Sequence, residues 1–267
     1  MKFVSLGSGS SGNCYLLQSG DTSILLDAGI GVRSLRKLLK DYGVSLERDI
    51  DALFVTHDHA DHIKAVGNIA CDYGKTIYAT QLVHAGIARN HCVTCKVPTS
   101  CTVVMEKGET VEVGAFRVTS FDVPHDSHDC VGYAVEAEGV RFCLATDVGH
   151  VTDIIRAQVD AANYLVLESN YDADMLRMGP YSPYLKGRSS SGRGHLSNAE
   201  AAQLLAEHAT PELRHAWLCH LSEENNHPEL ARKTAEAVLR DHGLIPGVDF
   251  ALDVLKRQSP SEIYTLT

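Results

Sequence analysis

The sequence predicts a single α+β domain in which two mixed sheets lie together with helices on their outer faces. Helix and strand patterns alternate near both ends of the chain, and the middle is nearly all strand. No solenoid repeat and no Pro- or Ser-rich linker divides the 267 residues. Domains of ~150 residues are usual, but α/β folds often reach ~250 residues as one unit. We therefore expect one domain over residues 1–267.

The first third of the chain alternates short strands with turns. Apolar residues between Val32 and Tyr42 recur at helical spacing, and Gly43 ends this expected helix. The run from Ala52 to Val55 indicates a strand that is buried on both faces. Alternating patterns continue to about Thr80, and residues 81–100 are ambiguous. Strands are expected at 2–6, 14–18, 23–26 and 51–56.

The middle of the chain is a run of strands, and the last third alternates again. Gly139, following Glu138, indicates a hairpin between the last two strands of the middle part. The expected strands of the middle part are 101–105, 110–113, 116–123, 131–136 and 140–145. The last third has expected helices at 151–159, 198–209 and 228–242, with strands at 164–167 and 216–219.

The composition is that of an ordinary globular protein. Hydrophobic residues make up 44% of the chain and charged residues 22%, which excludes wholesale disorder. The apolar runs are far shorter than the ~18 residues that cross a bilayer, and the N-terminus lacks a secretory pattern. We expect a cytoplasmic location and no membrane partner. Because the formal net charge is −10, contact with nucleic acid needs a local basic patch.

The eight cysteines are expected to be small buried hydrophobes rather than a disulfide framework, as is usual in a cytoplasmic chain. One cluster stands out, in which His91, Cys92 and Cys95 are followed by Cys101. Only one C-x-x-C pair is present, whereas structural zinc usually takes two paired ligand sets. Both a further metal site and a group of buried thiols therefore stay open for this cluster.

The strongest chemical signal is the segment Thr56-His57-Asp58-His59-Ala60-Asp61-His62, which directly follows a buried strand. In an extended loop the side chains of His57 and His59 point the same way, while Asp61 and His62 are placed to serve a second metal. Imidazole and carboxylate together suit Zn²⁺ or a similar divalent ion. Asp58 is expected to cap the turn or to orient an imidazole.

The pattern H-x-H-x-D-H after a buried strand resembles the signature of the metallo-β-lactamase superfamily. His125, Asp147 and His220 follow later strands in the order that this family's remaining ligands take. The resemblance implies a four-layer αβ/βα sandwich that holds two divalent ions, with zinc the first choice and manganese or iron the alternatives. It implies one metal on His57, His59 and His125, a second on Asp61, His62 and His220, and Asp147 as the bridge.

Further motifs narrow the resemblance within the family. His59 stands where flavodiiron-type members carry Glu, which disfavours a redox di-iron centre. The segment 194–198, Gly-His-Leu-Ser-Asn, is similar to an extra histidine motif of nuclease-type members such as ribonuclease Z. Segments 7–13, 168–170 and 220–226 resemble the WalJ/YycJ group, to which exonuclease action on DNA is ascribed. Tyr171 departs from that group, where we expect histidine.

The resemblance implies that a hydroxide shared by the two metals attacks phosphorus. Asp61 would orient this hydroxide, and His195 would give a proton to the leaving oxygen. The alternative for His195 is a plain turn before a helix capped by Ser197 or Asn198. Glu168 has two open interpretations as well, as a partner that orients a ligating histidine or as a helix cap on the surface.

Two segments are candidates for substrate contact. The Gly/Ser loop 7–13, with Ser8, Ser10 and Asn13, either offers backbone N–H groups to a phosphate or is a tight connection between strands. Residues 181–195 contain no acidic residue and include two tyrosines. The basic residues of this segment, which would form a rim for backbone phosphates, are Lys186, Arg188 and Arg193.

The sequence thus predicts a dinuclear metal-dependent phosphodiesterase, a DNA exonuclease, with nucleic acid as its partner. The alternative is a small-molecule hydrolase of the same fold, acting on a cyclic phosphodiester, a lactone or a thioester. A metal-binding sensor without turnover is a third hypothesis. Whether two copies pair as a homodimer stays open at this point.

Overall fold

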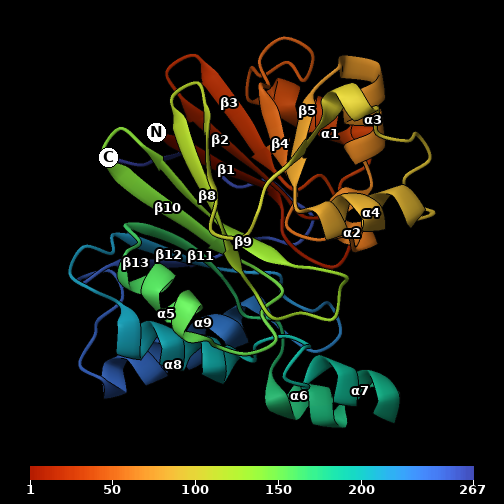
Figure 1. Cartoon of the computed structure of the whole chain (residues 1–267). Coiled ribbons are helices and arrows are strands. Elements are labelled where there is room, and N and C mark those ends of the chain that lie inside the picture. The colour runs from red at the N-terminus through yellow and green to blue at the C-terminus, as the bar shows by residue number, and fades with distance from the viewer.

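Two sheets pack face to face in the centre of the molecule, and helices cover the outer face of each (Figure 1). The computed structural model describes residues 1–267. The order of layers is helices, sheet, sheet, helices, so the predicted αβ/βα sandwich is confirmed. None of the helices is both long enough and apolar enough to cross a membrane.

The first sheet is built from the N-terminal part of the chain and one short C-terminal strand. Its strands are β1 (Lys2–Gly7), β2 (Cys14–Ser19), β3 (Thr22–Leu26), β4 (Ala52–Phe54), β5 (Thr76–Ala79), β6 (Thr102–Val104) and β14 (Tyr264–Thr265). Their order is β14-β1-β2-β3-β4-β5-β6. Neighbours are antiparallel from β14 to β3 and parallel from β3 to β6.

The second sheet repeats this division into an antiparallel and a parallel half. Its strands are β7 (Thr110–Val113), β8 (Phe116–Asp122), β9 (Val131–Ala137), β10 (Val140–Ala145), β11 (Tyr164–Glu168), β12 (His215–Cys219) and β13 (Ala251–Val254). Their order is β13-β12-β11-β10-β9-β8-β7. The pairs from β7 to β10 are antiparallel, and those from β10 to β13 are parallel.

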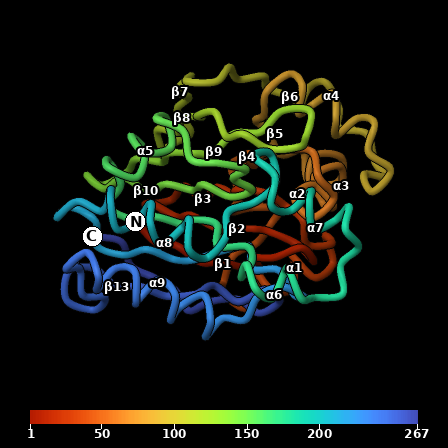
Figure 2. The backbone as a smooth tube through the Cα atoms, turned by 90° about the horizontal axis from the view of Figure 1, so that it is seen from below, coloured from red at the N-terminus to blue at the C-terminus, as the bar shows by residue number.

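The helices fall into two outer layers and one short arm. Over the first sheet lie α1 (Val32–Asp41), α2 (Ala60–Ile63), α3 (Val66–Tyr73) and α4 (Gln81–Arg89), and over the second α5 (Asp153–Asp160), α8 (Asn198–His208) and α9 (Pro228–Asp241). The arm consists of α6 (Ala173–Met178) and α7 (Pro183–Ser189). A short 3-10 turn, Thr99–Cys101, leads into β6. Figure 2 shows both termini at one end of the sandwich, with α2 and α7 at the other.

Three groups of buried apolar side chains hold the layers together. The central group joins the two sheets and includes Phe3 and Phe54 from the first, with Phe142 and Trp217 from the second. Each outer group joins one sheet to its own helices. A fully buried side chain of this size contributes about 1.5–3 kcal/mol, so the sandwich rests mainly on apolar burial.

Most of the expected elements are present, and the differences lie in short segments. The ambiguous stretch 81–100 contains α4, which begins with Thr80 Oγ1 accepting a hydrogen bond from the backbone N–H of Val83. The basic segment 181–195, for which no helix was expected, contains α7. Strands β13 and β14 were not predicted, because segments of four and two residues carry too little alternation to detect.

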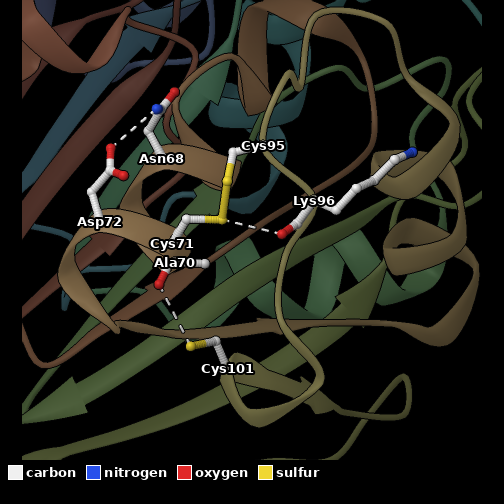
Figure 3. The surroundings of a disulfide bond; sticks show 7 residues. All are labelled: Asn68, Ala70, Cys71, Asp72, Cys95, Lys96 and Cys101. Carbon is white, nitrogen blue, oxygen red and sulfur yellow. Dashed lines mark hydrogen bonds between the residues drawn. A yellow bond between two sulfur atoms is a disulfide. The ribbon is translucent and has the colours of Figure 1, made fainter.

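Two of the cysteines form a disulfide, which corrects the expectation of free buried thiols for Cys71 and Cys95. Cys71 at the end of α3 is bonded to Cys95, with Cα atoms 6.7 Å apart (Figure 3). One turn earlier on α3, Gly67 packs against the backbone oxygen of Cys95, where a Cβ atom would collide. This close approach joins segments that are distant in sequence, so residue spacing does not reveal it. Six cysteines are free, and no cluster of metal donors includes a cysteine.

We expect removal of this disulfide to lower the free energy of unfolding by about 3 kcal/mol, because it closes a loop of 24 residues in the unfolded chain. The test is urea unfolding of Cys71→Ala/Cys95→Ala beside the original protein. Cys92→Ala, which removes a free and half-buried thiol, is the control. Equal unfolding midpoints for the double variant and the control would contradict the expectation.

Candidate metal centre

The site lies at one edge of the sandwich, where the carboxyl ends of parallel strands from both sheets meet. In the first sheet, Asp27 follows β3 and His57 lies just beyond β4. In the second sheet, Asp147 lies just beyond β10, Glu168 ends β11 and His220 follows β12. Ligands of α/β proteins bind outside the carboxyl ends of parallel strands, and these five side chains are gathered there.

Three of these residues have left-handed backbone. Asp27, Asp147 and His220 have φ values of 59°, 55° and 53°, and only one other non-glycine residue has a positive φ. Such a conformation costs about 1–3 kcal/mol per residue and persists where the surrounding structure enforces it. Strain of this kind concentrates at functional sites, and here it turns each side chain at the end of its strand.

The histidine-rich segment changes conformation within a few residues. His57 and His59 lie in the extended part before α2, and His59 is the residue that precedes the helix. Asp61 and His62 lie in the first turn of α2 rather than in a continuing loop. The helix turns them toward the second sheet, where His220 Nε2 lies 3.3 Å from Asp61 Oδ2.

One group of donors consists of His57, His59 and His125, whose ligand atoms all lie within 4.8 Å of one another. Nδ1 of His125 donates to the backbone oxygen of Gly194 at 2.9 Å, which leaves Nε2 directed at His59 Nδ1, 3.2 Å away. Nε2 of His57 is buried and has no hydrogen-bond partner. Burial and the neighbouring His62 keep the pKa of His57 well below its usual value, so this imidazole is neutral and free to ligate.

A second group consists of Asp61, His62 and His220, again with ligand atoms within 4.8 Å. Nδ1 of His62 donates to Asp27 Oδ2 at 2.7 Å, so Nε2 faces the site. Burial lowers the pKa of His62, but the carboxylates of Asp27, Asp147 and Asp61 outweigh it and raise the pKa to about 10. The position thus attracts a cation strongly, and a metal ion would take the place of this proton.

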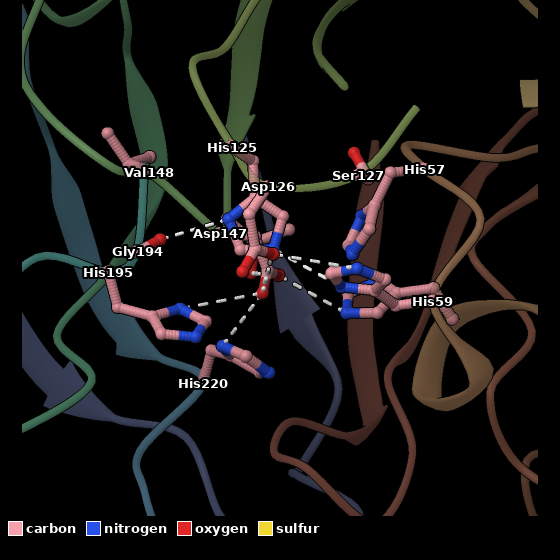
Figure 4. Close-up of polar contacts among 12 residues, drawn as sticks. His57, His59, His125, Asp126, Ser127, Asp147, Val148, Gly194, His195 and His220 are labelled. Carbon is pink, nitrogen blue, oxygen red and sulfur yellow. Dashed lines mark hydrogen bonds and ion pairs between the residues drawn. The ribbon is translucent and has the colours of Figure 1, made fainter. Parts of the chain in front are cut away.

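Asp147 lies between the two groups. Its Oδ2 is 3.2 Å from His62 Nε2, and its Oδ1 is 3.6 Å from His125 Nε2 and 3.4 Å from His220 Nδ1. Although burial raises the pKa of this carboxyl, the surrounding imidazoles, His220 first, hold it well below its usual value. Figure 4 shows the carboxylate between His57 and His59 on one side and His195 and His220 on the other.

Glu168 holds two imidazoles from behind. Its Oε1 accepts hydrogen bonds from His195 Nδ1 at 2.8 Å and from His220 Nδ1 at 2.9 Å. Its Oε2 accepts from the backbone N–H groups of Val148 and Leu196. Glu168 is fully buried, so it is not a helix cap on the surface. Since both of its oxygens have partners, Glu168 orients histidines rather than facing the cavity itself.

His195, which Glu168 holds, lies beside open space, as His59 does. Its side chain is 17% exposed and lines a cavity of about 290 Å³ together with Asp61, Asp147 and His220. Burial lowers the pKa of His195, but Glu168 raises it by more, so the net shift is upward. With Nδ1 held by Glu168, Nε2 is the atom free to give a proton. His195 also precedes the capping box of Ser197 and Glu200 at the start of α8.

The residues present fit a pair of divalent metal ions. The fit rests on the buried, unpartnered Nε2 of His57, on two donor groups that meet at one carboxylate, and on a ligand set of imidazole and carboxylate. Hydrogen bonds to Asp27, Glu168 and Gly194 fix the ring orientation of His62, His220 and His125. Such outer contacts are characteristic of metal-binding histidines.

The residues expected to contact substrate divide into two sets. Ser10 and Arg188 line the cavity. Ser8 and Asn13 are buried, which corrects their assignment as contact residues. The Ser8 hydroxyl bonds Tyr15 and accepts from the backbone N–H of His220, and Asn13 Nδ2 reaches Asp61 and His62. These two residues brace the loops of the site instead.

The other two basic residues of the expected rim are turned toward the protein. Lys186 donates to the backbone oxygen of Arg177, and the Arg193 guanidinium donates twice to the backbone oxygen of His125. Neither lines the cavity. Arg188 forms an ion pair with Asp126, which itself lies 3.6 Å from His59 Nε2. Of the predicted basic rim, the structure therefore leaves Arg188 at the cavity.

Comparison with known proteins agrees with this geometry. A family model described as a beta-lactamase superfamily domain matches residues 22–220. The chain belongs to the metallo-β-lactamase superfamily. It is 34% identical over 263 residues to the exodeoxyribonuclease YycJ of Bacillus anthracis, with 98% of each chain covered. It is 36% identical over 249 residues to the exodeoxyribonuclease WalJ of Streptococcus pneumoniae, covering 93% of this chain and 92% of WalJ.

Solved structures show the same fold. The metallo-β-lactamase fold protein YhfI of Bacillus subtilis superposes with a TM-score of 0.71 at 21% identity, covering 98% of both chains. Zn²⁺-bound PqqB of Methylobacterium extorquens also gives a TM-score of 0.71, at 18% identity, with 98% and 100% covered. The predicted fold, and the predicted assignment to a superfamily of metal-dependent hydrolases, are therefore confirmed.

Sequence reasoning missed two residues of this metallo-β-lactamase superfamily site. Asp27 directly follows the buried strand β3, and Asp147 lies just beyond β10. This shared position at the end of a strand was the signal in the sequence that could have identified Asp27. Asp126 adjoins His125 and was not assigned to the site, yet it pairs with Arg188 and approaches both His59 and His125. No spacing in the sequence indicates this pairing, because it joins two segments 62 residues apart.

We expect Asp27→Asn to weaken metal binding by about 10- to 100-fold, because it removes the carboxylate charge that holds His62. Asp27 itself is not one of the proposed metal ligands. Asparagine tolerates the left-handed backbone found here, so the fold should persist. Competition with a chelator, followed by metal analysis, measures the change. Asp51→Asn is the control, since Asp51 accepts a hydrogen bond from the backbone N–H of Ser23 away from the site. Metal affinity equal to that of the control would contradict this role.

Proposed function

We propose that this member of the superfamily is a dinuclear metal-dependent phosphodiesterase that acts as a DNA exonuclease. The observation that carries the proposal is a single cavity in which two groups of metal donors meet at Asp147, beside His195 held by a buried carboxylate. DNA is favoured as substrate because relatives aligned over 98% and 93% of this chain bear the name exodeoxyribonuclease.

In this proposal His57, His59 and His125 would hold one ion, and Asp61, His62 and His220 would hold the other. Asp147 would be the ligand common to both. Bound divalent ions would supply a nucleophile at neutral pH by lowering the pKa of water and would stabilise negative charge on the phosphate oxygens. Zinc is the first candidate, and the same ligand set accepts manganese or iron.

The protein's own side chains supply the rest of the chemistry. Asp61 reaches the cavity from α2 and orients the attacking group while it serves as a ligand. His195 presents Nε2 to the cavity, and its raised pKa favours the protonated form that a general acid needs. The proton passes from Nε2 to the sugar oxygen that leaves phosphorus, and Glu168 stabilises the imidazole throughout.

Substrate phosphates have two sets of donors at the rim. The backbone N–H groups of Gly9, Ser10 and Ser11 donate to no other group in the protein, and Ser10 and Ser11 are exposed. Successive free N–H groups of this kind bind anions. Arg188 also lines the cavity and can exchange Asp126 for a phosphate. Tyr181 lines the cavity as well and offers a ring on which a base can stack.

The test is hydrolysis of end-labelled single-stranded and duplex DNA beside bis(p-nitrophenyl) phosphate, with Zn²⁺ or Mn²⁺ added to chelator-treated protein. We expect both classes of substrate to be cut only with metal present, and DNA to be shortened stepwise from an end. Cleavage of the small ester alone would overturn the DNA assignment in favour of a small-molecule hydrolase. Binding of metal without any turnover would overturn the enzyme assignment.

A further inference from the structure

A row of basic side chains lies on α1, outside the candidate metal centre. In ten residues this helix carries Arg33, Arg36, Lys37 and Lys40 against a single acid, Asp41, in a chain whose formal net charge is −10. All four basic side chains are exposed, and none lies within ion-pair or hydrogen-bond distance of another side chain. By contrast, Arg232 and Arg240 on α9 both pair with Glu236.

Two hollows lie along the basic residues of α1. One, of about 500 Å³, is lined by Ser11, Gly12, Lys37 and Arg257 among others, with Asp41 as its acid. The other, of about 290 Å³, is lined by Arg36, Lys40 and Arg48, with Glu47 as its acid. The Arg36 guanidinium lies 6.0 Å from the centre of the Tyr73 ring, which limits its movement.

The larger hollow adjoins the cavity of the metal centre. Ser10 lines the cavity and Ser11, the next residue, lines the hollow. On the other side, Arg257 of the hollow donates to the backbone oxygen of Ser222, a residue of the cavity. The free N–H groups of Ser10 and Ser11 lie at this junction. A chain of anionic groups leaving the cavity past Ser10 therefore meets Arg257, Lys37 and then the rest of α1.

We propose that α1, with Arg257 and Arg48, binds the backbone of the DNA strand that continues beyond the reacting phosphate. This inference rests on the proposed function, because the strand is that of the proposed substrate. Unpaired cations on an otherwise acidic protein are suited to bind a polyanion. They interact with the charged backbone of DNA and do not distinguish base sequence. A helix of ten residues is about 15 Å long, which matches roughly four to five nucleotides of one B-form strand.

The test compares DNA of two lengths. Arg36→Ala/Lys37→Ala/Lys40→Ala removes three cations and keeps a good helix former at each position. The metal-loaded protein is assayed on three substrates. These are single-stranded oligonucleotides of about 4 and about 24 nucleotides, and bis(p-nitrophenyl) phosphate. Arg232→Ala/Lys233→Ala/Arg240→Ala on α9 is the control, because it changes the net charge by the same amount on another exposed helix.

We expect the α1 variant to raise KM for the long oligonucleotide by about tenfold or more. The slope of log KM against log salt concentration should fall by about 2, because each lost phosphate contact reduces it by ~0.7. Cleavage of the short oligonucleotide and the small ester should not change, which also shows that the variant folds. Wild-type behaviour of the α1 variant on the long substrate, or an equal loss in the α9 control, would overturn the inference. An unmodified protein that cleaves the small ester but no DNA would instead overturn the proposed function, and this inference with it.

Discussion

Asp147→Asn is expected to abolish hydrolysis of every substrate and to reduce the bound metal from two ions per chain to one or none. Asp147 is the carboxylate at which the two donor groups meet, with His125 of one group 3.6 Å away and His62 of the other 3.2 Å away. Asparagine is close in size to aspartate and also tolerates the left-handed backbone, with φ of 55°, found at this position. It lacks the negative charge that two cations would share. If the shared anion contributes about 4 kcal/mol to the transition state, the rate falls about 10³-fold.

Metal analysis of the purified variant, together with its rate on bis(p-nitrophenyl) phosphate, measures both parts of this expectation. Asp153→Asn, at a position 99% exposed on α5, is the matched control and should behave as the original protein. A circular dichroism spectrum and melting curve in the presence of chelator compare the folds without metal. Full metal content in the Asp147 variant would contradict the assignment of Asp147 as the common ligand.

Asp147 was found from the sequence and Asp27 was not, although the two residues occupy similar positions in the fold. Both residues follow buried strands of parallel pairs, and both have left-handed backbone. Asp147 was identified only because the order of motifs along the chain matched a known pattern. Asp27 belongs to no such motif, and its role arises from a hydrogen bond to His62, 35 residues away.

The fold itself could be predicted because its signals are local. Each long strand and each amphipathic helix carries its own periodicity, and the hairpin at Gly139 carries its own turn residue. What could not be predicted depends on which surfaces meet. The disulfide of Cys71, the pairing of Arg188 with Asp126 and the absence of partners around the α1 cations all arise between segments far apart in sequence.

The residues that contact substrate could not be predicted from the sequence for a similar reason. Composition correctly identified 181–195 as basic, but charge on a segment does not say where its side chains turn. Lys186 donates to the backbone carbonyl of Arg177 and Arg193 donates to that of His125, whereas Arg188 reaches the cavity. The Gly/Ser loop likewise keeps Ser8 inside and leaves Ser10 outside, because the loop leaves β1 and turns at once.

His195→Ala is expected to separate two kinds of substrate. A general acid contributes about 10²- to 10⁴-fold where the leaving oxygen needs a proton, as a sugar oxygen of DNA does. The p-nitrophenolate ion leaves without protonation, so hydrolysis of the small ester should fall by less than about tenfold. The bound metal should be unchanged, since His195 is not among the proposed ligands. His242→Ala, at an exposed histidine beyond α9, is the control.

Glu168→Gln tests whether His195 depends on the carboxylate behind it. The pKa of His195 is raised chiefly by Glu168 against the effect of burial, so removing that charge lowers the pKa. The acid form is then lost at lower pH, and the alkaline limb of the DNA cleavage profile should move to lower pH. Because Glu168 also holds His220, metal affinity should fall by about 10- to 100-fold, and the rates are compared at saturating metal. In His195→Ala, hydrolysis of DNA and of the small ester could instead fall by the same factor, with less metal bound. That result would make His195 a metal ligand beside Asp147 and His220, and the mechanism would lose its general acid.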